Sequence, residues 1–220
     1  MGRMIDYARP DGATSRGYLA EAAGPGPAVV VIQEWWGLNA QIRGIADHIA
    51  EAGFTALAPD LFRGRLAATA DEGSHLMNEL DFADATHQDI AGAVARLGSG
   101  GARVGVAGFC MGGALTIAAA VHLRAVAAAV CFYGIPPRAF ADPARIRIPF
   151  QAHFARRDDW CTPAVVDALE ADMRAAGAAP EIYRYDAAHA FCNASRAEVY
   201  DAACADQAWA RTFAFFARTL

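Results

Sequence analysis

Short apolar runs that do not alternate with polar residues recur along the chain, and each is followed by a segment with helical periodicity. Ala28–Ile32 is the first such run, and Arg103–Phe109 is another. Strands that are buried on both faces of a parallel sheet have this continuous apolar character. Because strand and helix alternate along the whole chain, the sequence predicts an α/β fold with a mostly parallel central sheet and helices on both faces.

Local signals mark the ends of several predicted elements. Two extended segments flank the turn at Asp11 and Gly12, which predicts an N-terminal β-hairpin. Asn39 can cap the first helix and Gly53 can end it. The expected strands are 3–8, 16–20, 28–32, 54–58, 103–109, 125–132, 148–154 and 181–185. The expected helices lie between residues 39 and 53 and at about 72–80, 84–97, 111–122, 163–176 and 200–219.

Composition limits the classes of protein to which the chain can belong. Of 220 residues, 55% are hydrophobic and 20% charged, and no repeat or linker divides them, so a single domain over 1–220 is expected. The net charge of −5 and the scattered arginines argue against nucleic-acid binding. The longest uncharged apolar run, Ala125–Tyr133, has the length of a strand, so no membrane association is expected.

Five cysteines without a C-x-x-C pair indicate free thiols rather than a disulfide framework or a zinc ribbon. The N-terminus also lacks the apolar stretch of a signal peptide. We therefore expect a cytoplasmic protein, as a monomer or small homo-oligomer. No set of residues has a standard metal-ligand spacing, so no metal and no cofactor are expected.

The segment Gly108–Gly113 (GFCMGG) lies between a predicted strand and a predicted helix. It matches the G-x-S-x-G nucleophile elbow, with Cys110 in place of serine. Such a turn strains the nucleophile's backbone, and the flanking glycines remove side chains that would clash. A thiol at a helix N-terminus is favoured as thiolate, and the Met111 N–H is free to bind an oxyanion.

A nucleophile elbow predicts an acid and then a histidine later in the chain. Asp158 follows the strand 148–154, and His189 follows the strand 181–185 in a loop. We predict a triad in which His189 takes the proton of Cys110 and Asp158 fixes the tautomer of His189. Asp159 is an alternative acid. His153 lies a few residues before Asp158 and is a candidate for supporting the triad through a contact with one of its members.

The first core strand ends at Gln33, Glu34 and Trp35, on the same edge of the predicted sheet as Cys110. A glutamate at this position is costly to bury unless it is paired or used. We predict that Glu34 lies near Cys110 and that the Trp35 N–H completes an oxyanion hole with that of Met111.

These motifs together resemble the dienelactone hydrolase (carboxymethylenebutenolidase-like) family of α/β-hydrolases. The matching stretches are Val30–Arg43, Ala58–Phe62, Val104–Ala114, Asp158–Pro163 and His189–Phe191. The resemblance implies Cys110 as nucleophile, His189 as base and Asp158 as its partner. It also implies that Glu34 helps to ionise the thiol once substrate is bound.

The chain departs from the family at the residues that hold the substrate carboxylate. The family has an arginine shortly after the catalytic histidine, where this chain has Asn193, and a second arginine before the elbow, where His75 is the only candidate cation. Arg63 and Arg65 are alternatives, although solvated loop positions suit them better. Aromatic residues crowd the predicted site and favour a flat or apolar substrate if they line it: Trp35, Trp36, Phe62, Phe109, Trp160 and Phe191.

The sequence therefore predicts a cysteine-nucleophile hydrolase of a small lactone or ester. We expect Trp36, Phe109, Trp160, Phe191, Asn193 and His75 among its substrate contacts. One alternative is a carboxylesterase or thioesterase that acts on a less acidic substrate. Another is a ligand binder or thiol sensor on the same scaffold that has no catalytic activity.

Overall fold

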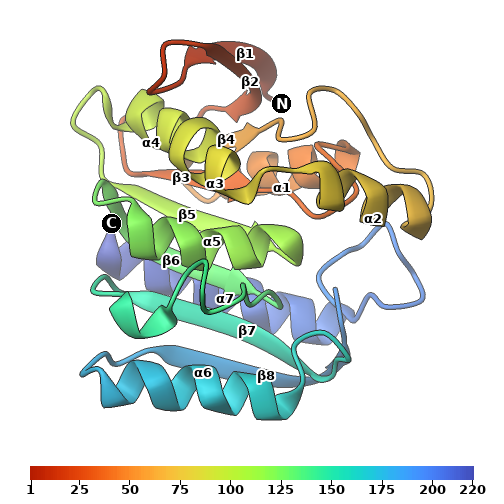
Figure 1. Ribbon diagram of the computed structural model, residues 1–220. Helices are drawn as coiled ribbons and strands as arrows, with labels where there is room; N and C mark the ends of the chain where they lie inside the picture. Colours follow the sequence, from red (N-terminus) through yellow and green to blue (C-terminus); the bar gives the residue numbers. More distant parts are fainter.

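An eight-stranded sheet forms the centre of the protein in the computed structural model, which describes residues 1–220 (Figure 1). The strand order is β1-β2-β4-β3-β5-β6-β7-β8. Strands β3 to β8 are parallel, and the hairpin β1–β2 joins β4 in antiparallel orientation. The strands are β1 (Arg3–Ala8), β2 (Thr14–Ala20), β3 (Ala28–Ile32), β4 (Thr55–Pro59), β5 (Val104–Phe109), β6 (Val126–Phe132), β7 (Phe150–Arg157) and β8 (Glu181–Ala188). The predicted α/β-hydrolase architecture and its N-terminal hairpin are confirmed.

Helices cover both faces of the sheet and divide the core in two. A cluster of 28 buried residues packs α1 (Ala40–Glu51) and α7 (Ala202–Thr219) against one face. A cluster of 33 lies on the other face, beneath α4 (Ala91–Gly98), α5 (Met111–His122) and α6 (Pro163–Ala175). The buried face of α1 consists of Ile42, Ile45, Ala46 and Ile49, and Asn39 caps the helix, as predicted, by accepting a hydrogen bond from the Ile42 amide. No helix is both long and apolar enough to cross a membrane.

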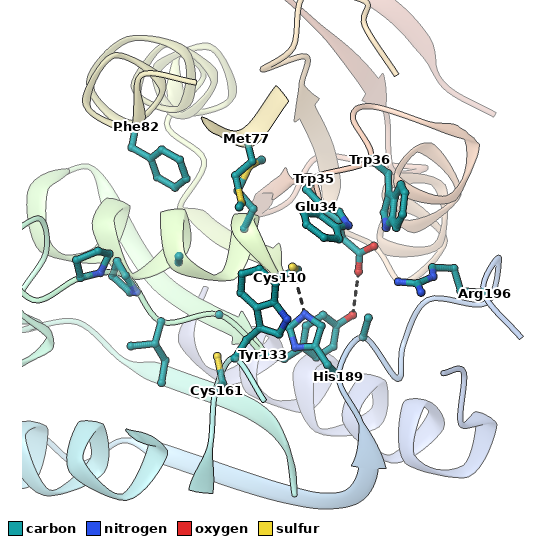
Figure 2. A pocket seen from close by; sticks show the side chains of 18 residues that line it. Glu34, Trp35, Trp36, Met77, Phe82, Cys110, Tyr133, Cys161, His189 and Arg196 are labelled. Atoms are coloured by element: carbon teal, nitrogen blue, oxygen red, sulfur yellow. Dashed lines mark hydrogen bonds between the residues drawn. The ribbon is translucent and has the colours of Figure 1, made fainter. Parts of the chain in front are cut away.

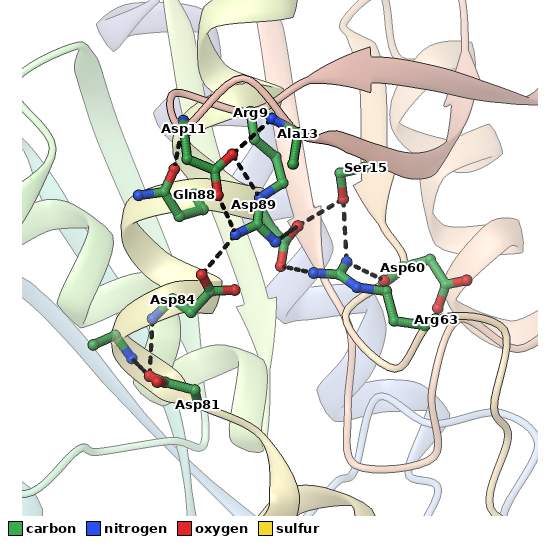
Figure 3. A network of polar contacts seen from close by, with 11 residues as sticks. Arg9, Asp11, Ala13, Ser15, Asp60, Arg63, Asp81, Asp84, Gln88 and Asp89 are labelled. Carbon is green, nitrogen blue, oxygen red and sulfur yellow. Dashed lines mark hydrogen bonds and ion pairs between the residues drawn. The ribbon is translucent and has the colours of Figure 1, made fainter.

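The predicted helix 84–97 is helical throughout, but its first half is not an α-helix. The chain forms a short α3 (Phe82–Asp84), then a π-helix (Ala85–Ile90), and only then α4. The π-helical turn carries Asp89, whose carboxylate is 1% exposed. It accepts hydrogen bonds from Ser15 at 2.6 Å and from Arg63 at 2.8 Å (Figure 3).

Arg9 joins the same network from the N-terminal hairpin, pairing with Asp84 at 2.6 Å and Asp89 at 3.4 Å (Figure 3). The network thus ties the hairpin and the segment after β4 to the π-helix. A buried carboxylate must be paired, so we attribute the widened turn to the fit of Asp89 into this network. Local periodicity carries no information about such a long-range pairing.

Several other boundaries differ from the predicted ones. Helix α2 (Ala70–Glu79) begins earlier because Thr69 and Glu72 form a reciprocal capping box at its start. The last two strands, β7 and β8, each run three residues further than predicted. As a result, their carboxyl ends deliver Asp158 and His189 directly to the edge of the sheet where β5 delivers Cys110.

Candidate active site

Cys110 occupies the tight turn between β5 and α5. Its φ of 54° and ψ of −115° lie where non-glycine residues are rarely found. A Cβ atom on Gly108 would come within 2.1 Å of the Gly112 carbonyl oxygen, and one on Gly112 within 2.3 Å of the Ile32 carbonyl oxygen. The glycine pattern is therefore required by close backbone approach, and the strained turn predicted from it is present.

Three side chains from three strand ends meet at this turn. His189 Nε2 lies 3.2 Å from Cys110 Sγ, and His189 Nδ1 donates a hydrogen bond of 2.7 Å to Asp158 Oδ2. The other oxygen of Asp158 accepts hydrogen bonds from the amides of Trp160 and Cys161 at 2.8 and 2.9 Å. Asp158 is buried, whereas Asp159 is exposed. The geometry therefore selects Asp158 over its neighbour as the partner of His189.

The contacts between these groups favour charge on both His189 and Asp158. Burial alone would lower the pKa of His189, but its hydrogen bonds to Asp158 and Cys110 outweigh burial and raise the pKa to about 10. Burial alone would raise the pKa of Asp158, but His189 and the two amides outweigh it and hold the pKa below its usual value. The imidazolium form of His189 is the form that stabilises an adjacent thiolate.

Cys110 and His189 open into a cavity of about 410 Å³ (Figure 2). Twelve of its 18 lining residues are hydrophobic. The lining comes from the ends of β3 and β6, from α2, α3 and α5, and from the loops that follow β7 and β8. This volume lies in the range of small-molecule sites, and a few polar groups inside an apolar wall are typical of them.

Glu34 lies in the wall of this cavity and is 1% exposed. Its carboxylate accepts hydrogen bonds from Asn193 Nδ2 at 2.6 Å and from the Tyr133 hydroxyl at 3.3 Å. Asn193 is held in turn because its Oδ1 accepts hydrogen bonds from the amide and hydroxyl of Ser195. Burial raises the pKa of Glu34, and its hydrogen bonds offset this effect only in part. In this structure Glu34 points to Asn193 and Tyr133 (its hydrogen-bond partners) rather than to Cys110.

We expect Glu34→Gln to stabilise the fold at neutral and mildly alkaline pH. Because the pKa of Glu34 is raised in the folded protein, ionisation of Glu34 costs stability as pH rises above the unfolded pKa. Glutamine keeps both hydrogen bonds, since the Tyr133 hydroxyl can also accept one. Thermal unfolding should show a Tm increase at about pH 8 that disappears near pH 4.

Glu51→Gln is the matched control, since Glu51 is exposed on α1, and it should not reproduce the Tm increase of Glu34→Gln. A Glu34→Gln protein that unfolds at a lower temperature than wild type at about pH 8 contradicts this account of the buried carboxylate.

The two residues predicted to supply oxyanion-binding amides, Met111 and Trp35, line the same cavity as Cys110. Met111 is the first residue of α5, so its N–H has no partner within the helix. Trp35 follows Glu34 in a turn at the end of β3, and both Trp35 and Met111 line the cavity. The backbone of α5 approaches that of β3 closely at Gly112, which brings these two segments together.

Only some of the predicted substrate contacts line the cavity. Trp36 and Trp160 line the cavity, and Trp160, 64% exposed, stands at its mouth beside Trp35. Phe109 and Phe191 are wrong as substrate contacts because both are fully buried in the core. Phe109 stacks on Phe132, and Phe191 packs against Tyr133 and Tyr185.

Asn193 is buried behind the cavity wall and contacts Glu34 rather than the cavity. His75 is also wrong as a substrate contact. Its exposed side chain pairs with Glu79 at 3.0 Å on α2, outside the cavity. Arg65 pairs with Glu79 as well, and Arg63 belongs to the Asp89 network, so neither offers a cation to the cavity. His153 contacts Tyr185, Gln151 and Thr212 and makes no hydrogen bond to the triad.

The structure adds residues that sequence reasoning missed. Tyr133 follows β6 at the active edge and has a positive φ of 39°. Arg196 lines the cavity, with its guanidinium carbon 5.1 Å from the centre of the Trp36 ring. The sequence contained evidence for both residues. Tyr133 directly follows a predicted core strand, and Arg196 is the only arginine between His189 and the last helix.

Comparison with known proteins agrees with this geometry. A model of the dienelactone hydrolase family matches residues 15–220. "Protein usf" of Aquifex pyrophilus is 34% identical, and a protein of Aquifex aeolicus (strain VF5), provisionally named a carboxymethylenebutenolidase, is 32% identical. Each alignment covers 98% of this chain and 98% of the relative.

Among solved structures, a dienelactone hydrolase-like promiscuous phosphotriesterase, P91, from metagenomic libraries superposes with a TM-score of 0.87. The two chains are 25% identical, and the match covers 100% of this chain and 98% of that one. The chain therefore belongs to the dienelactone hydrolase family and is a hydrolase that acts on esters.

Proposed function

We propose that the protein hydrolyses a small lactone or ester through Cys110 as a covalent nucleophile. The observation that carries the proposal is the line of contacts from Cys110 through His189 to Asp158, at 3.2 and 2.7 Å. Nucleophile, base and orienting acid stand within hydrogen-bond reach of each other, as covalent catalysis requires. The strained turn holds the sulfur at the edge of an apolar cavity with room for a substrate.

The reaction follows from the positions of these groups. The thiolate of Cys110 attacks the carbonyl carbon, and the amides of Met111 and Trp35 bind the resulting oxyanion. The imidazolium of His189 then donates its proton to the leaving alcohol oxygen as the carbon–oxygen bond breaks, which leaves a thioester. Water attacks the thioester while His189 takes its proton, and the carboxylic acid and the thiol are released. None of these steps needs a cofactor.

Glu34 acts on the first step in this proposal. Its buried carboxylate lies beside the cavity and has only neutral hydrogen-bond donors, Asn193 and Tyr133. When substrate displaces water from the cavity, a carboxylate in this position helps the transfer of the thiol proton to His189 by stabilising the imidazolium that forms. In this proposal Glu34 has the role that the family resemblance implies, although its hydrogen-bond partner is Asn193 where the family has an arginine.

The composition of the cavity favours a neutral, largely apolar ester over the family's acidic lactone. Twelve of 18 lining residues are hydrophobic, and Arg196 is the only cationic side chain besides a protonated His189. Among the lactones and esters of the proposed function, the cavity therefore favours a small neutral ester, the substrate class of a carboxylesterase. The free thiols of the chain suit a reducing cytoplasm, where we propose that the enzyme works.

Hydrolysis of a dienelactone and of phenyl acetate by the wild-type protein tests the function. We expect turnover of phenyl acetate and, under rapid quenching, an acetyl adduct on the Cys110 peptide in mass spectrometry. An adduct on another residue, or turnover with no covalent intermediate on Cys110 under any quench condition, contradicts the mechanism. Binding of both compounds without hydrolysis supports the reading of a binder or sensor instead.

We expect Arg196→Gln to change the preference between the two substrates. Arg196 is partly exposed, lies over Trp36 and pairs with Glu198 at 2.8 Å, so its guanidinium can turn toward a substrate carboxylate. Loss of a charge-assisted hydrogen bond should lower the ratio of dienelactone to phenyl acetate kcat/KM by about tenfold or more. Arg65→Gln, at the alternative arginine, should leave the ratio unchanged. If the kcat/KM ratio falls in Arg65→Gln but not in Arg196→Gln, Arg65 is the residue that binds the substrate carboxylate.

A further inference from the structure

The cavity has two ends of different character, and the Cys110–His189 pair lies between them. Figure 2 shows Met77 and Phe82 on the opposite side of Cys110 from Trp36 and Arg196. Glu34 and Arg196 supply the charge at one end. Met77 and Phe82 mark the other end (Figure 2), and we group with them the apolar lining residues Ile135, Pro136 and Pro137 as the apolar arm, because Ile135 packs on the same core cluster as Met77 and Phe82. No lining side chain of the apolar arm carries a charge or a hydrogen-bonding oxygen or nitrogen.

Two separate segments build the apolar arm. Met77 belongs to α2 and Phe82 to α3, whereas residues 135–137 follow β6. The ring of Phe82 meets that of Phe140 edge-on at 6.2 Å, which joins α3 to the loop after β6. Met77, Phe82, Ile135 and Phe140 are all partly buried against the same core cluster, on the face of the sheet that carries α5. The two segments of the apolar arm are therefore held by the same core cluster and by contact with each other.

The apolar arm lies on the side of the catalytic groups where the acyl chain of a bound ester would extend. The leaving oxygen of an ester must come within hydrogen-bond reach of His189 to receive its proton. The other substituent of the carbonyl carbon then points away from His189. Met77 and Phe82 lie on the side of Cys110 away from His189 (Figure 2), and Met111 and Ala114 of α5 line the same cavity.

We propose that the apolar arm is an acyl-binding subsite that makes the enzyme selective for esters of medium-length, uncharged acyl chains. This inference rests on the proposed function and names its substrate class. A carboxylate placed in the apolar arm would lose its hydration with no partner. Each methylene buried there gains transfer free energy, which corresponds to about a fourfold increase in kcat/KM per methylene until the arm is full.

Two ester series separate the acyl side from the alcohol side. The first keeps the 4-nitrophenyl leaving group and lengthens the acyl chain from acetate through butanoate and hexanoate to octanoate. The second keeps the acetyl group and lengthens the alcohol. We expect kcat/KM to rise at least about tenfold from acetate to hexanoate in the first series and to stay level in the second. A level acyl series with active acetate overturns the subsite but leaves the proposed function standing.

Variants assign the effect to the apolar arm itself. Met77→Glu should lower the hexanoate-to-acetate ratio of kcat/KM by about tenfold because the new carboxylate lines the arm. Met77→Leu, which keeps the apolar surface, should retain the ratio. Asn78→Glu is the matched control, since Asn78 is exposed on the same helix and lies outside the cavity. An equal fall of the ratio in Asn78→Glu contradicts the assignment.

A binding measurement keeps the inference testable if no ester is turned over. The apolar ketone 2-nonanone cannot be hydrolysed, and Trp35 and Trp160 in the cavity report its binding by fluorescence. We expect it to bind wild type at least about tenfold more tightly than it binds Met77→Glu, with acetone far weaker on both. Equal affinity of 2-nonanone for wild type and Met77→Glu overturns the subsite.

Discussion

Replacement of Cys110 by alanine is expected to lower kcat for phenyl acetate by about 10⁴-fold or more while leaving the protein folded. Alanine removes the sulfur that forms the thioester, and the remaining groups only position water near the carbonyl. The Cys110 side chain is not part of the buried core, so its loss leaves little unfilled volume. Steady-state kinetics measure the loss, and thermal unfolding shows that the fold is retained.

A second thiol provides the control for this prediction. Cys204 lies on α7 away from the cavity and is, like Cys110, only partly buried. Burial raises the pKa of the Cys204 thiol, whereas Cys110 lies beside the imidazole of His189. Cys204→Ala should therefore keep wild-type turnover, and iodoacetamide should alkylate Cys110 first. Wild-type turnover in Cys110→Ala overturns covalent catalysis at this residue.

The strands of the parallel sheet could be predicted from the sequence because each of them depends on local signals. Ala28–Ile32 and Val104–Phe109 are continuous apolar runs, and each precedes a helix whose start is marked by a cap or by glycine. Burial on both faces leaves few alternatives for such segments. The π-helix was not predictable, since it depends on Asp89 meeting Ser15, Arg9 and Arg63 from distant segments.

For the candidate site, chain order and sheet topology predicted which residues meet. Parallel strands end at one edge, so residues that follow β5, β7 and β8 had to lie near each other. The structure brings Cys110, Asp158 and His189 together as expected. It did not follow from the sequence which aromatic residues face the cavity. Phe109 alternates into the core on its strand, whereas Trp160 lies in a loop whose direction is set by hydrogen bonds to Asp158.

The cation of the cavity was missed for a related reason. Asn193 stands where the resemblance to the family predicts an arginine, and the segment before the elbow offers only His75 as a replacement cation. The loop after His189 instead turns back at Asn193, whose Oδ1 accepts hydrogen bonds from Ser195, and so carries Arg196 to the cavity. A turn held by a side chain changes which residue of a loop faces the site.

Asp158→Asn is expected to lower kcat by about 10³- to 10⁴-fold, close to the loss from removing the base itself. Asp158 Oδ1 accepts the amides of Trp160 and Cys161, and Oδ2 accepts from His189. An asparagine would keep its oxygen on the two amides and turn its NH₂ group toward His189 Nδ1. The imidazole must then carry its proton on Nε2, where it can no longer take the proton of the Cys110 thiol.

The same substitution has a readout that does not depend on turnover. The hydrogen bond to Asp158 is one of the contacts that raise the pKa of His189 to about 10 against the opposing effect of burial. Without the carboxylate, burial dominates, so the pKa of His189 should fall well below that value in an NMR titration. Asp159→Asn is the matched control, because Asp159 is exposed and makes no hydrogen bond to His189. If Asp159→Asn loses activity and Asp158→Asn does not, the acid of the triad is Asp159. A carboxylate that contacts the imidazole affects both turnover and the pKa of His189, whereas one that only supports the loop affects turnover alone. The kinetic measurement and the NMR titration together therefore show whether Asp158 orients His189.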